Sequence, residues 1–183
     1  MVKFVLGLAA AGLIAALAAL AVIETGAFGV AASTPHGALL AWATHTTMIH
    51  AVAHDAADQT APPGPTAAQV EAGFTLYDRD CVACHGGPGV ARADWVAGMN
   101  PSPPFLLDAA RHWSRGDLHW IVGNGVKMTG MPAWRESRDQ AQIWDLVAFL
   151  QALPYVSPAA YAAMRRAQAL ATSRAAEAAA GRR

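Results

Sequence analysis

The chain contains two cysteines, Cys81 and Cys84, which lie three positions apart and are followed directly by His85 in the segment CVACH. Two thiols and an imidazole at this spacing are typical of a disulfide, a thioredoxin-like redox pair, half of a zinc site, or the covalent attachment of haem. A four-cysteine zinc site is excluded because the sequence has no third thiol. The choice among the others depends on the rest of the chain.

Helix signals dominate the chain after residue 65. Capping boxes predict three helix starts: Thr66 with Gln69, Ser114 with Asp117, and Ser137 with Gln140. The helices are expected to run to about Asp80, over DLHWIVGNG, and over DQAQIWDLVAFLQAL as far as Pro154. Long stretches rich in Gly and Pro separate them, and no segment alternates with the period of a strand. The predicted fold class is therefore all-α with irregular loops.

The helical pattern reduces the number of possible roles for the cysteine pair. A thioredoxin-like site needs strands, and about 90 helical residues with long loops bury only a thin core on their own. A covalent haem fits both observations, because two thiols add to its vinyl groups, the histidine binds its iron, and the porphyrin supplies apolar mass. We therefore predict one haem c attached through Cys81 and Cys84, with His85 as an axial iron ligand.

Two further segments accompany this motif. GFTLYDRDCVACH carries Gly73 and Tyr77 before the cysteines, and IWDLVAFLQALP carries Trp144 and Phe149. Over residues 66 to 155 these features resemble the class I c-type cytochromes, here in a membrane-anchored bacterial form. The resemblance implies three main helices around the haem, with the aromatic last helix crossing the first near Gly73. Close crossing would explain a helical glycine that costs about 1 kcal/mol.

The resemblance also implies a methionine as the second iron ligand. In GVKMTGMPAW, Met131 and Pro132 match the family's methionine-proline pair, and Gly125 ends the preceding helix as the family does. Pro132 biases Met131 towards an extended conformation, and Gly130 gives the backbone freedom to approach the porphyrin. Met131 is the predicted ligand. Met128 is the alternative, and it otherwise packs at the haem rim.

Further residues are expected near the haem. Candidates for lining it or meeting its propionates, or alternatively for ordinary packing, are Trp113, Trp120, Trp134 and Arg111. His112 and His119 are expected at the surface or beside the propionates rather than as ligands. Pro88 is expected to offer its carbonyl to the ring N–H of His85, a role that the family fills with backbone.

The N-terminus carries twenty residues without a charge, from Phe4 to Ile23. Twenty helical residues span roughly 30 Å, the thickness of the hydrocarbon core, whereas a signal peptide core has only about 7 to 15. A retained single-pass anchor in a bacterial inner membrane is expected, with cleavage at GVAAS as the alternative. Lys3 before the span and Glu24 after it predict a cytoplasmic N-terminus and a periplasmic remainder.

Residues 35 to 58 are helix-like but too polar for a second span. They carry an apolar stripe suited to a membrane surface or a partner, formed by Leu39, Trp42, Ile49 and Val52. They also hold four of the seven histidines: His36, His45, His50 and His54. Solvated histidines are expected rather than a metal site, because no cysteine or carboxylate completes one.

The predicted organisation has four parts: an N-terminal anchor at 1–33, an interfacial helix and Pro-rich linker at 34–65, a cytochrome c domain at 66–156, and a basic tail at 157–183. The tail carries five arginines and one glutamate, against seven basic and nine acidic residues in the cytochrome part. Ser157 and Pro158 predict a helix start there. We expect this helix to contact anionic headgroups or an acidic partner, or else to be solvated.

The predicted function follows from the ligand set. Thirteen basic and thirteen acidic side chains leave no basic excess for nucleic acid. With His85 and Met131 on the iron, no small-molecule substrate reaches it, which indicates an electron carrier rather than an enzyme. The expected partners are redox proteins or a membrane oxidase or reductase complex of a respiratory chain. The alternatives are a haem enzyme such as a peroxidase with an open sixth position, and a non-catalytic docking subunit.

Overall fold

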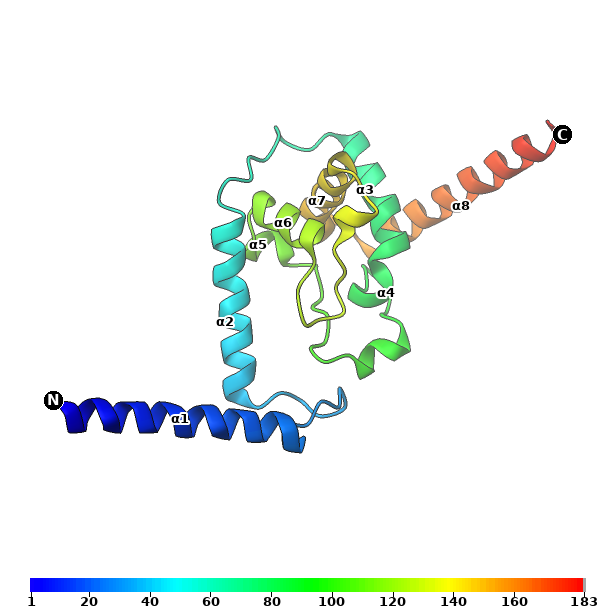
Figure 1. Cartoon of the computed structure of the whole chain (residues 1–183). Helices are drawn as coiled ribbons and strands as arrows, with labels where there is room; N and C mark the ends of the chain where they lie inside the picture. Colours follow the sequence, from blue (N-terminus) through cyan, green and yellow to red (C-terminus); the bar gives the residue numbers. More distant parts are fainter. Residues whose placement is uncertain (183) are drawn as a thin grey trace. The chain divides into compact units, whose positions relative to one another are not determined.

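A computed structural model describes residues 1–182, and it is α-helical with no β-strand in that range, which confirms the predicted fold class. The chain divides into a unit that ends at Pro35 and a second that begins at His36. The helices are α1 (Val2–Thr25), α2 (Ala38–Asp55), α3 (Ala67–Asp80), α4 (Val82–His85), α5 (Ala109–His112), α6 (Arg115–Asn124), α7 (Gln140–Ala152) and α8 (Pro158–Ala180), with 3-10 turns η1 (Asp94–Gly98), η2 (Trp134–Glu136) and η3 (Leu153–Tyr155) (Figure 1).

The uncharged N-terminal run forms a single helix, α1, which ends at Gly26 in the left-handed conformation with φ 66°. All of its side chains are exposed. Among the described residues it is the one helix long and apolar enough to cross a membrane, judged by length and composition.

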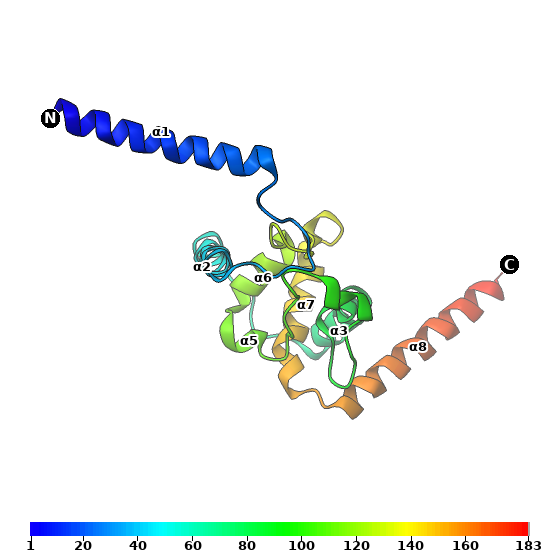
Figure 2. The ribbon, with the colours of Figure 1, turned by 90° about the horizontal axis from the view of Figure 1, so that it is seen from below.

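The second unit is built around the crossing of α3 and α7, whose ribbons lie against each other in both views (Figure 1, Figure 2). At the crossing, a Cβ on Gly73 would overlap the backbone carbonyl of Asp145 and lie 2.9 Å from the Cβ of Phe149. Phe149 packs edge-on against Phe74, with ring centroids 5.6 Å apart. The implied close crossing at Gly73 is therefore present.

The core of this unit extends from α3 and α7 to α6 and the start of α8. Its fully buried members include Phe149, Ile143, Leu146 and Tyr161. Tyr161 packs on Phe74 and donates a hydrogen bond to Asp78 of α3 at 2.9 Å. The first turns of the basic C-terminal helix therefore belong to the packed core, whereas the side chains of residues 169–182 are exposed. Ser157 caps this helix as predicted.

Helix α2 and the segment after it pack on α6. Val52 and Ala56 are buried, and the side-chain carbonyl of Gln59 lies 3.0 Å from Nδ1 of His119. Arg115 donates a hydrogen bond to the carbonyl of Pro62 at 2.7 Å. These contacts join α2 and the Pro-rich segment to the domain predicted at residues 66–156.

Two of the three predicted capping boxes are confirmed, at Thr66 and Ser114. The third prediction is wrong. The cap of α7 is Asp139, which accepts from the amide of Gln142 at 2.9 Å, while Ser137 ends the 3-10 turn before it. The cause is that the chain stays non-helical through Arg138, whose guanidinium reaches back to α3.

Replacing Gly73 by Ala is expected to lower the free energy of unfolding by about 1–3 kcal/mol, because the added methyl group would overlap α7. Gly123→Ala is the matched control, since a Cβ there meets only ordinary contacts, 3.5 Å from Arg135 and 3.6 Å from Ile143. Denaturant titration of both variants measures this. Equal effects at the two positions would contradict the close crossing.

Replacing Asp139 by Ala is expected to reduce the free energy of unfolding by about 1 kcal/mol, the usual effect of losing an N-cap. Ser137→Ala should leave it almost unchanged. Urea unfolding curves compare the two variants, and a larger loss for Ser137→Ala would restore the original prediction.

Candidate functional site

The two cysteines and the histidine lie on one short helical turn directly after α3. The carbonyl of Cys81 accepts hydrogen bonds from the amides of Cys84, at 3.1 Å, and His85, at 2.9 Å. Both cysteines are free and partly buried. Burial, together with the negative charge of Asp80 and the neighbouring Cys84, raises the pKa of the Cys81 thiol to about 12, so this thiol is protonated at neutral pH. No disulfide joins the pair in this structure.

The imidazole of His85 is oriented by a backbone carbonyl. Its Nδ1 lies 2.7 Å from the carbonyl oxygen of Pro104. A carbonyl only accepts, so Nδ1 carries the proton and Nε2 keeps its lone pair. Burial lowers the pKa of His85, and nearby Arg92 adds to this, which favours the neutral ring that a metal requires. The expected partner, Pro88, is wrong: the carbonyl comes from Pro104, nineteen residues after the histidine.

The loop that follows His85 is fixed from two sides. The hydroxyl of Tyr77 donates to the carbonyl of Gly86 at 2.7 Å. Gly86 has φ 70°, a conformation that favours glycine. On the other side, a Cβ on Gly87 would lie 3.0 Å from the ring of Tyr161. The aromatic residue noted at position 77 therefore holds the backbone next to the histidine.

The two candidate methionines differ in their surroundings. Met131 is partly buried and packs against the core, and its amide donates to the hydroxyl of Thr129 at 3.1 Å. Met128 is 85% exposed and has φ 61°. A Cβ on Gly125 would lie only 2.6 Å from backbone atoms of Met131 and Pro132. This close contact fixes the base of the loop.

A third methionine, Met99, was not singled out from the sequence. Its terminal methyl group occupies the place where Gly130 would carry a side chain. The loop of residues 99–104 therefore contacts both candidate ligand segments, through Met99 at Gly130 and through Pro104 at His85. Only the contacts reveal this, because a methionine in a Pro-rich stretch carries no pattern of its own.

The other residues expected near the haem are distributed over the unit. Trp113 and Trp134 are partly buried against the core, Trp120 is half-buried, and Arg111 is exposed beside Asp108 at 3.3 Å. His112 is exposed, as expected. His119 is not at the surface: it is 5% exposed and stacks on Trp144 with ring centroids 4.1 Å apart.

His45, His50 and His54 of α2 are exposed, and so is His36, which lies just before the helix. Within residues 1–182, no group of three or more His, Cys, Asp or Glu side chains is placed to hold a metal ion.

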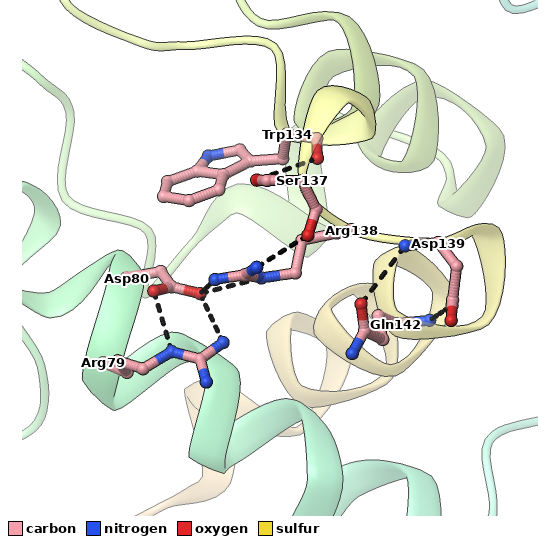
Figure 3. Close-up of polar contacts among 7 residues, drawn as sticks. All are labelled: Arg79, Asp80, Trp134, Ser137, Arg138, Asp139 and Gln142. Atoms are coloured by element: carbon pink, nitrogen blue, oxygen red, sulfur yellow. Dashed lines mark hydrogen bonds and ion pairs between the residues drawn. The ribbon is translucent and has the colours of Figure 1, made fainter.

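A carboxylate at the end of α3 ties the cysteine turn to α7. Figure 3 shows Asp80 between two guanidinium groups. Arg79 donates to it at 2.9 Å and Arg138 at 2.8 Å, and the side chain of Asp80 is only 10% exposed. Burial opposes ionisation, but the two guanidinium groups outweigh it and lower the pKa of Asp80. The residue before Cys81 is thereby fixed to the start of α7.

Replacing Arg138 by Ala is expected to lower the free energy of unfolding at pH 7 by about 1.5–3 kcal/mol, the range for hydrogen bonds to charged groups. Because the folded state lowers the pKa of Asp80, this stabilisation is present above the ordinary aspartate pKa of about 3.9 and is lost as the pH falls through the folded value. The difference between wild type and variant should therefore shrink below about pH 4.

Unfolding curves across this pH range check the expectation. Arg166→Ala, at an exposed position of α8, is the control and should change little at any pH. A pH-independent loss in Arg138→Ala would show that Asp80 is not the group involved.

Comparison with known proteins covers the same region. Residues 68–150 match the family model of cytochrome c oxidase, cbb3-type, subunit III. The Cbb3-type cytochrome c oxidase subunit CcoP of Azospirillum brasilense is 34% identical over 91 residues, which make up 48% of this chain and 29% of that protein. The chain therefore corresponds to less than a third of this relative. The matched region contains the cysteine turn, the loop around Met131 and the crossing of α3 and α7, and its family implies a haem c cofactor. The segment of residues 68–150 is therefore similar to these cbb3-type oxidase subunits, and this similarity supports a c-type cytochrome domain.

Proposed function

We propose that this chain is a membrane-anchored monohaem c-type cytochrome that carries single electrons to or within a respiratory oxidase complex. The observation that carries the proposal is the orientation of His85. A carbonyl holds its Nδ1–H and leaves the Nε2 lone pair for iron, on the same turn as two free cysteines. Metal-bound histidines commonly have this arrangement.

The residues present fit a covalent haem. Cys81 and Cys84 would form the two thioether links, and His85 would be one axial ligand. When bound, the haem supplies a one-electron Fe(II)/Fe(III) couple. The chain's own contribution is to orient the imidazole through Pro104 and to fix the adjacent backbone through Tyr77.

Met131 is the proposed second axial ligand. It is partly buried, whereas Met128 is 85% exposed. As a ligand together with His85, its neutral thioether would favour Fe(II) and raise the reduction potential relative to two histidines. If His85 and Met131 both bound the iron, no coordination position would remain for a substrate, which would favour electron transfer over peroxidase-like catalysis.

The proposed partner is a membrane respiratory complex. The relative named above is a subunit of a cbb3-type oxidase, and this chain matches it over 91 residues. Helix α1 would hold the domain at the membrane. Lys3 before the span and Glu24 after it favour a periplasmic domain. Tethering restricts diffusion to two dimensions and raises the local concentration near membrane partners.

Replacing Met131 by Ala should abolish the weak red sulfur-to-iron charge-transfer band of the ferric protein, lower its reduction potential and let the ferrous protein bind carbon monoxide. Met128→Ala is the matched control and should leave all three properties unchanged. Optical spectroscopy and redox titration of both variants provide the test.

The reverse pattern would transfer the ligand to Met128. Carbon monoxide binding by the ferrous wild type would favour the haem enzyme with an open sixth position.

A further inference from the structure

One apolar stripe along α2 is covered at one end and bare at the other. Trp42, Ile49 and Ala56 follow one another at intervals of seven residues, which places them on one face of a helix. Their exposed fractions are 64%, 38% and 5%. Exposure therefore rises steadily from the C-terminal end of the helix towards its N-terminal end.

The covered end lies against α6. Ala56 and Val52 are buried there, and Gln59 and Arg115 add the polar contacts that hold α2 to the cytochrome unit. The bare end includes Leu39, which is 76% exposed, beside Trp42. An exposed tryptophan and leucine on a helix whose other half packs normally indicate a second surface that covers them.

The amino-acid composition around α2 indicates what kind of surface covers its bare end. None of the thirty residues from 25 to 54 is Asp, Glu, Lys or Arg. A segment of this length would ordinarily carry roughly seven, because about a quarter of residues in soluble domains are charged. An exposed segment without formal charges loses little hydration energy when it enters a lipid headgroup layer.

The chain position points to the bilayer. Helix α1, the candidate span, ends at Thr25, and twelve residues separate it from the start of α2 at Ala38. That connection carries Phe28 and Val30, which are 54% and 91% exposed. Tryptophan is enriched at membrane–water interfaces, where its ring is apolar and its N–H can remain hydrated.

We propose that residues 38–49 of α2 lie in the headgroup layer of the bilayer that α1 spans, with Leu39, Trp42 and Ile49 facing the acyl chains. The proposal rests on the membrane anchorage proposed above. Because the C-terminal half of α2 is fixed to α6, this second attachment restricts how the cytochrome domain turns relative to the membrane surface. A single flexible tether would not do so.

The test uses the full-length haem-loaded protein in nanodiscs of phosphatidylcholine and phosphatidylglycerol, with lipids brominated on their acyl chains. Bromine quenches tryptophan fluorescence only at short range. Lipid-dependent quenching should be present in wild type and almost lost in Trp42→Phe. Trp95→Phe is the matched control, because Trp95 is similarly exposed, at 60%, and this variant should keep the quenching. The haem spectrum reports that each variant is folded.

Quenching that is unchanged in Trp42→Phe would overturn the proposal. The proposal would also be overturned if lipid alone gave no quenching and Trp42 became protected only after a purified oxidase was added. That result would assign the stripe to a protein partner. Carbonate washing of membranes separates this failure from loss of the anchor. If the protein stays in the membrane but Trp42 is not quenched, only the interfacial position of α2 is refuted. If the protein is released, the interfacial position and the membrane anchor are both refuted.

Discussion

The close crossing of α3 and α7 at Gly73 is the contact on which the cytochrome unit depends. Without a Cβ at this position, the helix backbones approach until Asp145 and Phe149 lie directly against Gly73. The crossing fixes the direction of α3, and the cysteine turn follows α3 without a break. Asp80 then ties this end to the start of α7 through Arg138. Helix packing thus determines where the two thiols and the imidazole lie.

The irregular segments between the helices supply further contacts around the cysteine turn. Residues 99–104 form no helix, yet they supply the carbonyl that orients His85 and the methionine side chain that contacts Gly130. Tyr77 and Tyr161 both contact the glycine loop after His85, at Gly86 and Gly87 respectively. An electron carrier benefits from such contacts, because a ligand geometry that stays the same in both oxidation states keeps the reorganisation energy of electron transfer small.

Local patterns predicted the helices well, and long-range contacts account for the misses. Ser137 and Asp139 each precede a glutamine by three residues, so the sequence alone offers two equivalent caps for α7. The contact of Arg138 with Asp80, 58 residues away, decides between them. The partner of His85 was missed for the same reason, since Pro104 lies in a loop without periodicity. His119 was placed at the surface because nothing local indicates that Trp144 and Gln59 cover it.

The central claim is that Cys81 and Cys84 hold one haem covalently. Acidic acetone extraction of the purified protein, followed by intact-mass spectrometry, tests it most directly, because this treatment removes haem that is held only by ligation and packing. The account predicts that the colour stays with the precipitated polypeptide and that its mass exceeds that of the chain by one haem. Extraction of the haem into the acetone, or a chain mass without any haem, would contradict it.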